Sequence, residues 1–213
     1  MRYRSRKSDL IRLVPAVAVL LVHAPGSWSA ERSWTAEPAV QQRLARGEVV
    51  VETATATDPG GPHGTVRAAV LIRARPEDIW SVMTDCRQTL TFVPGLKLCR
   101  RVGAAADGRW EDIEQEIRYA WYLPTVRYVL RADYDRPRRI DFRRISGDLK
   151  EEEGTWALSP APGGTATLVE YHMYLDPGFW IPQALVARSL RRDLPAALLG
   201  LRERVQQLPR AGR

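Results

Sequence analysis

Residues 65–101 read TVRAAVLIRARPEDIWSVMTDCRQTLTFVPGLKLCRR, and this stretch decides the fold. From Val66 to Ile72 every second residue is apolar, which predicts a β-strand with one buried face. Pro76 then opens a helix, because a proline has no N–H that would need a partner in the first turn. The two acidic residues after Pro76 favour the positive end of that helix. The stretch therefore begins with a strand followed directly by a short helix.

The second part of the stretch predicts a further short helix and a return to strand. The apolar face of the first helix is formed by Ile79, Val82, Met83 and Cys86. A second helical segment, residues 88–92, ends at Pro94-Gly95. A strand interrupted by two small helices suits a sheet that curls around something and must be closed at one end.

The rest of the chain indicates an antiparallel meander flanked by helices. Residues 37–46 predict a short helix, residues 48–57 a strand, and residues 58–64 a turn. After Gly95, turn residues separate strands expected at about 96–103, 109–119, 125–135, 138–146, 150–159 and 165–175. Successive hairpins imply one antiparallel sheet.

The C-terminal segment, residues 181–208, predicts a long helix with one apolar stripe that needs a cover. Pro195 lies inside it, so we expect a kink or a break there. The concave apolar face of the sheet is the cover that the sequence offers. The order of elements is that of an α+β helix-grip fold, a curved antiparallel sheet wrapped around a long C-terminal helix, with two short helices after the first grip strand.

The apolar parity of the strands indicates which side chains face the helix. Tyrosines at inward positions need a partner for the hydroxyl, and a half-apolar cavity with a polar ligand would supply one. Ordinary core packing is the alternative. The candidate ligand-binding residues are Tyr119, Tyr128, Leu130, Ala132, Phe142, Trp156, Tyr171 and Met173.

The N-terminus has the pattern of a secretory signal peptide. Five basic residues precede an apolar run from Leu13 to Val22, and small residues follow at Ser27 and Ser29. This predicts cleavage after Ser29 or Ala30 and a periplasmic or secreted protein. An uncleaved anchor is the alternative, although a membrane-spanning helix needs roughly 20 apolar residues. We therefore divide the chain into a signal peptide at 1–30, a helix and strand extension at 31–64, and a main domain at 65–209.

Charge and motif content exclude several function classes. The chain carries 32 Lys+Arg and 25 Asp+Glu, but part of the excess lies in the leader and the remaining charges alternate. A nucleic-acid-binding surface would be one-sided, so we expect no such partner. We expect no metal and no cofactor, because the histidines are not at ligand spacing to the cysteines. We find no catalytic constellation either: His172 beside Glu170 reads as a surface pair, and the acids at 151–153 as an exposed strand start.

The two cysteines, Cys86 and Cys99, predict a disulfide if the protein is exported. It would tie the end of the first helix to the following strand. The alternative is a pair of buried free thiols.

Several segments together resemble a known group of proteins. VLIRARPEDIWSVMTD, FVPGLKLCRRV, GTWALSP, TLVEYHMYLDPG and DLPAALLGLRERV are similar to the START-like SRPBCC superfamily. The similarity is greatest to its polyketide cyclase/dehydrase and coenzyme-Q-binding branch, in an exported bacterial form. The resemblance covers about residues 40–208 and implies a hydrophobic ligand between sheet and helix.

The resemblance implies a module that binds, and carries or sequesters, a lipid, an isoprenoid quinone or a similar apolar molecule. A polyketide aromatase/cyclase using the same cavity is an alternative, which export disfavours because polyketide synthesis needs cytosolic thioester carriers. An interaction domain with a filled core is a third. Counting turns along the meander places two aromatic clusters at the same end of the sheet, where relatives have the cavity mouth. These mouth residues are Trp121, Tyr122, Phe179 and Trp180. We expect them to touch a membrane transiently during ligand transfer; the alternative is that they pack on each other.

Overall fold

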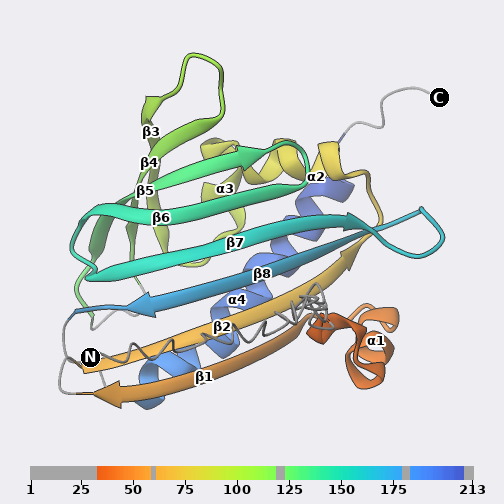
Figure 1. The fold of residues 1–213 in the computed structure, drawn as a ribbon, viewed down its shortest axis with the longest axis horizontal. Coiled ribbons are helices and arrows are strands. Elements are labelled where there is room, and N and C mark those ends of the chain that lie inside the picture. The colour runs from red at the N-terminus through yellow and green to blue at the C-terminus, as the bar shows by residue number, and fades with distance from the viewer. Residues whose placement is uncertain (1–32, 59–60, 119–122, 179–182, 209–213) are drawn as a thin grey trace, which may run out of the picture. The chain divides into compact units, whose positions relative to one another are not determined.

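The computed structural model describes residues 33–58, 61–118, 123–178 and 183–208. In this part of the chain, one antiparallel sheet has the strand order β1-β2-β8-β7-β6-β5-β4-β3 (Figure 1). The strands are β1 Val50–Asp58, β2 Gly61–Ile72, β3 Leu96–Ala104, β4 Trp110–Ile117, β5 Val126–Asp135, β6 Arg139–Gly147, β7 Glu151–Pro160 and β8 Thr167–Asp176. Strands β3 to β8 form the expected meander, and β2 closes the arrangement by pairing with β8.

The helices begin and end where local chemistry dictates. They are η1 Trp34–Ala36, α1 Pro38–Ala45, α2 Pro76–Met83, α3 Cys86–Phe92 and α4 Gln183–Gln206. Pro76 occupies the first turn of α2, as its missing N–H allows. The Asp85 carboxylate caps α3 by accepting a hydrogen bond from the backbone N–H of Arg87 at 2.9 Å.

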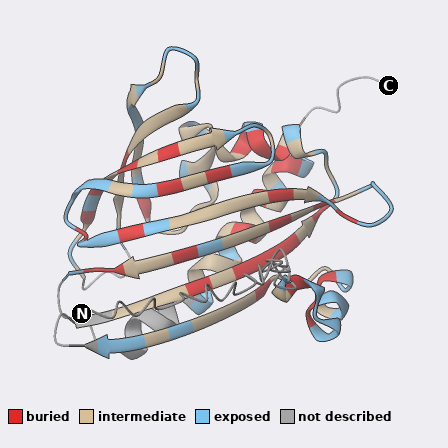
Figure 2. Ribbon diagram, in the orientation of Figure 1, coloured by how far each residue is buried: buried red, intermediate tan, exposed pale blue. Residues whose placement is uncertain are grey.

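The two faces of the sheet differ in what covers them. We call the face that packs on α4 the concave face and the opposite one the convex face. On the concave face, Val70, Leu158 and Val169 form a core with Leu198 and Leu201 of α4. On the convex face, α1 covers the first two strands by packing Val40 and Leu44 onto Val50 and Ala69. Buried and more exposed residues alternate along the strands, as a two-faced sheet requires (Figure 2).

Helix α4 leans toward one edge of the sheet. It packs against β1, β2, α2 and α3, and Figure 1 shows it crossing behind β8, β2 and β1. Helix α2 covers strands farther along the same concave face, where Trp80 packs with Ala132 of β5 and Ile140 of β6. The concave side of the meander is therefore roofed jointly by α2, α3 and α4, and this arrangement positions the site described below.

The predicted α+β helix-grip fold is confirmed, with local corrections. The expected turn at 58–64 is shorter, because β2 begins at Gly61 and Gly64 is paired with Thr55 of β1. The expected domain boundary at residue 65 stays a prediction, and residue 65 itself belongs to β2. Cys86 belongs to α3 and not to the end of α2, since α2 ends at Met83.

Of the kink or break expected at Pro195, the break does not occur, because α4 runs from Gln183 to Gln206 with this proline inside it. A proline removes one backbone hydrogen bond, which tertiary packing of the apolar stripe can offset. Leu198, Leu201 and Val205, all after Pro195, are buried in the core. The helix is therefore held by the sheet and not by its local sequence alone.

Candidate functional site

A cavity of about 270 Å³ lies between the concave face of the meander and the helices α2, α3 and α4. Every strand from β3 to β8 contributes to its wall. The strand residues that line it are Leu96, Ile113, Gln115, Ile117, Tyr128, Leu130, Ala132, Tyr134, Ile140, Phe142, Glu152, Trp156, Tyr171 and Met173. The roof includes Met83 of α2, Phe92 of α3 and Leu194 of α4. A wall of this composition suits a ligand that is mostly apolar.

The cavity brings together the candidate ligand-binding residues that lie in the described part of the chain. These are Tyr128, Leu130, Ala132, Phe142, Trp156, Tyr171 and Met173. Tyr119 lies outside the described residues, and so do the mouth residues Trp121, Tyr122, Phe179 and Trp180. Parity along the strands therefore predicted one continuous surface, because residues of one parity on neighbouring strands stand side by side.

An aromatic wall forms where β6, β7 and β8 meet. The rings of Trp156 and Tyr171 have centroids 4.2 Å apart, and Phe142 stacks on Tyr171 at 6.0 Å with an interplanar angle of 11°. Gly154 makes room for this wall, since a Cβ there would lie 2.6 Å from Cζ of Phe142 and 2.2 Å from the carbonyl oxygen of His172. Only glycine fits at this point of β7.

The inward tyrosines find hydroxyl partners within the protein. The Tyr128 hydroxyl donates to Oε1 of Gln115 at 3.0 Å, and that of Tyr171 contacts the Met173 sulfur at 2.8 Å. The Tyr134 hydroxyl donates to Glu111 at 3.1 Å. Burial, followed by the Glu111 charge, raises the pKa of Tyr134, so this phenol stays protonated. A ligand is thus not needed to satisfy these hydroxyls, contrary to the sequence argument.

Glu152 is the feature of the cavity that the sequence argument placed wrongly. The sequence predicted that Glu152 lies at an exposed strand start, but this residue is only 7% exposed and its side chain lines the cavity. Its Oε2 atom is buried without a hydrogen-bond partner. Burial alone raises the pKa of Glu152 to about 8. At neutral pH this side chain is therefore mainly a neutral carboxylic acid, which can donate a hydrogen bond.

The outer wall of the cavity is fixed to the sheet by a covalent bond and a close helix contact. Cys86, the first residue of α3, is joined by a disulfide to Cys99 of β3, with Cα atoms 5.2 Å apart. Helix α3 also approaches α4 closely, because a Cβ at Gly200 would lie only 2.7 Å from Cβ of Phe92. The position of Phe92 on the cavity wall thus depends on contacts on both sides of α3.

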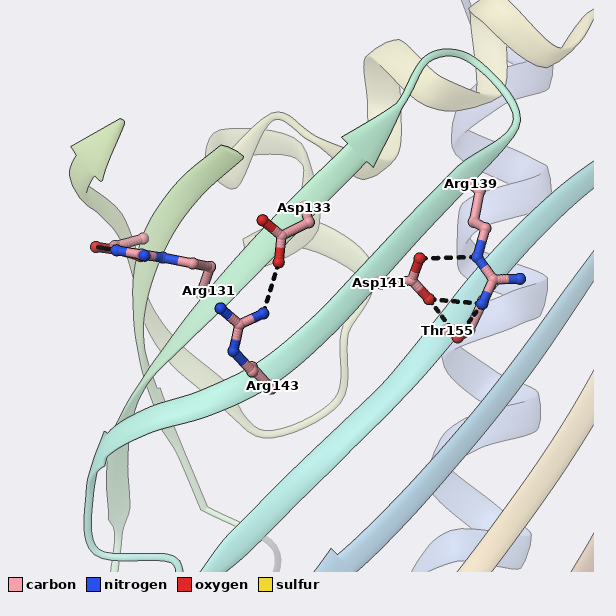
Figure 3. Close-up of polar contacts among 7 residues, drawn as sticks. Arg131, Asp133, Arg139, Asp141, Arg143 and Thr155 are labelled. Atoms are coloured by element: carbon pink, nitrogen blue, oxygen red, sulfur yellow. Dashed lines mark hydrogen bonds and ion pairs between the residues drawn. The ribbon is translucent and has the colours of Figure 1, made fainter. Parts of the chain in front are cut away.

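The convex face of the same strands carries paired charges (Figure 3). Arg131 donates two hydrogen bonds to Asp112, at 2.8 and 2.9 Å, and Arg143 bonds Asp133 at 2.7 Å. Arg139 binds Asp141 through two bonds of 2.7 Å. The arginine beside it lowers the pKa of Asp112 and likewise that of Asp141. His172 is exposed on this face, as its parity predicted.

The ligand-binding residues predicted from the sequence did not include the wall residues of the helices, or Gln115 and Glu152 of the strands. Thr89, Phe92, Leu194 and Ala197 belong to the helical part of the wall. Their helices were predicted, and the apolar stripe of the C-terminal helix was expected to face the sheet, but these residues were not assigned to a ligand cavity. Glu152 could have been found, because it shares the parity of Trp156, whose inward position was recognised.

The comparisons with known proteins agree with this geometry. The family described as polyketide cyclase / dehydrase and lipid transport matches residues 72–202. A START superfamily protein from Mycobacterium smegmatis is similar in structure, at 20% identity and TM-score 0.59, over 68% of this chain and 99% of the other. A STAR-related lipid transfer protein from Xanthomonas axonopodis is similar at 17% identity and TM-score 0.60, over 74% and 94%.

An aromatase/cyclase from Streptomyces sp. R1128 also has this fold, at 14% identity and TM-score 0.59, over 70% of this chain and 97% of that one. No curated protein matches the sequence. Among the described residues, no helix is long and apolar enough to cross a membrane. The same residues contain no group of three or more His, Cys, Asp or Glu side chains placed to hold a metal ion.

Proposed function

The chain belongs to the polyketide cyclase/dehydrase and lipid transport family, within the START/SRPBCC superfamily, and from this premise we propose that it binds and carries or sequesters one hydrophobic small molecule, a lipid or an isoprenoid quinone. The observation that carries the proposal is the cavity of about 270 Å³ with its largely apolar wall. A packed protein interior leaves few voids larger than a water molecule. A space of this size under the helices is therefore suited to a ligand, and it argues against a domain with a filled core.

The first test identifies what the protein holds. The protein is purified from its host without denaturation, extracted with organic solvent, and the extract is analysed by mass spectrometry. One apolar compound per protein molecule supports binding. A polyketide aromatase/cyclase, the second candidate, would instead convert an added polyketide chain to a product of lower mass through loss of water. A protein that carries nothing and takes up no apolar fluorescent compound contradicts both.

The second test fills the cavity. Ala132 lines the cavity and is only 5% exposed, so Ala132→Trp places a large side chain in the space. We expect uptake of the neutral fluorescent compound N-phenyl-1-naphthylamine to be lost while thermal unfolding stays cooperative. Ala157, paired with Arg139, belongs to the convex parity of β7, and Ala157→Trp is the matched control that should keep uptake. Equal uptake by both variants would show that the ligand binds elsewhere.

We also propose that ligand enters at the end of the sheet where the β4–β5 and β8–α4 connections lie. The described residues beside these connections lie at one end of the sheet, because the β6–β7 turn forms hydrogen bonds with the start of β5 and with the end of β8. The N–H of Asp148 donates to the carbonyl of Arg127 at 2.8 Å, and that of Lys150 to the carbonyl of Asp176 at 3.2 Å. The mouth residues Trp121, Tyr122, Phe179 and Trp180 flank this end in the sequence. Aromatic residues of this kind suit transient contact with a membrane surface.

Single changes of Trp121 and Trp180 to Ser test the membrane contact. Slower transfer of a fluorescent lipid from liposomes, at an unchanged melting temperature, is the expected result. Normal transfer with lost stability would mean that the two aromatic clusters pack on each other.

We propose finally that the protein is exported to the periplasm or secreted. The basic and apolar leader at residues 1–30 supports export, and a disulfide is typical of an oxidising compartment. N-terminal sequencing of the protein from its host should find a start just after Ser29 or Ala30, and an intact Met1 would contradict it.

A further inference from the structure

Glu152 is an acidic side chain in an apolar cavity with no partner in the protein for one of its carboxyl oxygens. It is the second residue of β7, paired with Leu175 of β8, and its side chain lines the cavity. The residue is 7% exposed, and its Oε2 atom makes no hydrogen bond. Leaving a buried polar atom unsatisfied costs about 1–3 kcal/mol. A ligand that bonds to this atom would recover that loss.

The surroundings of Glu152 decide what kind of ligand group it suits. Among the described residues that line the cavity there is no lysine, arginine or histidine. A ligand anion would therefore meet no positively charged side chain among these described lining residues and would stand near an acidic group. A neutral carboxylic acid, in contrast, has one O–H to donate to an acceptor oxygen.

We propose that Glu152 is the polar recognition group of the cavity, which donates one hydrogen bond to a ketone, ester or quinone oxygen of an otherwise apolar and uncharged ligand. This inference rests on the proposed function, because it assigns the polar contact of the same cavity. It narrows the ligand class to neutral molecules that carry a carbonyl-type acceptor, and it places free fatty acids in their anionic form outside that class.

Other ionisable and charged groups face the same cavity or belong to the same face of the sheet, and the test must separate them from Glu152. Tyr128, Tyr134, Tyr171 and Asp193 line the cavity. Arg144 of β6 is paired with Leu130, and its guanidinium donates to the backbone oxygens of Gly147 and Lys150. All of these groups remain in a variant changed only at Glu152, so a comparison at equal pH isolates the carboxyl group.

The experiment compares two ligands of nearly equal shape, 2-dodecanone and 2-methyl-1-dodecene, in which a CH₂ replaces the ketone oxygen. Each displaces N-phenyl-1-naphthylamine from the wild type, Glu152→Gln and Glu152→Leu, at pH 6 and at pH 9.5. Glutamine keeps a hydrogen-bond donor at both pH values, whereas leucine has none. Glu153→Gln is the matched control, since Glu153 is the exposed neighbour on the opposite face.

At pH 6 we expect the wild type, Glu153→Gln and Glu152→Gln to prefer the ketone over the alkene roughly three- to tenfold more than Glu152→Leu does, the worth of one hydrogen bond. At pH 9.5 the wild type should lose this preference and Glu152→Gln should keep it. An equal ketone-to-alkene ratio in all variants, with the naphthylamine still bound, would overturn the role of Glu152 and leave the proposed function standing. Failure of the wild type to bind the naphthylamine or either probe would overturn both.

Discussion

Two acidic residues on opposite faces of strands β4 to β7, Asp112 and Glu152, have opposite environments. On the convex face, Asp112 lies opposite Arg131, which donates two hydrogen bonds to it and lowers its pKa. On the concave face, Glu152 lies opposite Leu175, and burial raises its pKa to about 8. The Asp112 carboxylate is thus stabilised as a charge by its arginine partner, whereas burial without such a partner keeps the Glu152 carboxyl neutral. The convex face carries paired charges, while the concave face is suited to an uncharged ligand.

The largest expected effect is the pH dependence of stability caused by Glu152. In the folded protein this group keeps its proton up to a pKa of about 8, against a usual value of 4.5. Between these values the folded state binds more protons, so the free energy of unfolding falls as pH rises, by about 1.4 kcal/mol per pH unit. Relative to Glu152→Gln, the wild type should lose about 3–5 kcal/mol between pH 4.5 and pH 8. Urea unfolding of both proteins across this range measures it, and parallel curves would mean that Glu152 is solvated.

The second expected effect concerns the wall that separates the cavity from solvent. Replacing Cys86 and Cys99 by serine should lower the free energy of unfolding by about 3 kcal/mol, because a disulfide restricts the unfolded chain. Uptake of N-phenyl-1-naphthylamine should weaken as α3 loosens, while the convex ion pairs stay formed. Thiol labelling of the denatured, non-reduced wild type gives the control, and two reactive thiols would show that the bond does not form.

A third prediction compares glycines on the two faces. Gly154→Ala should destabilise the protein by about 1–3 kcal/mol, because its Cβ would meet the carbonyl oxygen of His172 and the ring of Phe142. Gly103→Ala is the matched change in β3, where the three nearest atoms all belong to the Asp112 side chain, the nearest at 3.0 Å, and none is a backbone atom. Thermal unfolding should show a clearly larger loss for Gly154→Ala. Equal losses would mean that the concave face is as adaptable as the convex one.

The smallest expected effect is at the convex ion pair. Asp112→Asn should lower stability by less than about 1 kcal/mol at pH 7, since part of the pair is exposed to solvent. Because the folded pKa of Asp112 is lowered, its contribution is present above the usual pKa of 3.8 and is lost as pH falls through the folded value. Urea unfolding at pH 7 and pH 3 should therefore show a smaller difference at pH 3. If the stability difference between the wild type and Asp112→Asn were larger at pH 3 than at pH 7, the lowered pKa of Asp112 would be contradicted.

The success of the sequence reasoning depended on the range of the interactions involved. The strand parity of Tyr128, Phe142 and Tyr171 predicted the cavity wall, because alternation along a strand is a local property. The same alternation also places Glu152 on the inward face. Its position was overlooked because three consecutive acidic residues resemble a solvent-exposed run. The hydroxyl partner of Tyr128 could not be predicted, since Gln115 of β4 meets it only through strand register. The partner of Tyr171 is local, because Met173 lies two residues further along the same strand.

By itself, the sequence determined the order of strands and helices, the inward parity of the meander and the pair of cysteines that the fold joins. Each of these follows from periodicity, turn chemistry and residue type along the chain. The tertiary structure alone decided that α4 runs unbroken past Pro195, that α3 and α4 approach at Gly200, and that Oε2 of Glu152 has no hydrogen-bond partner. The physical reason is that burial and unsatisfied hydrogen bonds depend on what other elements place beside a residue, which local pattern does not contain.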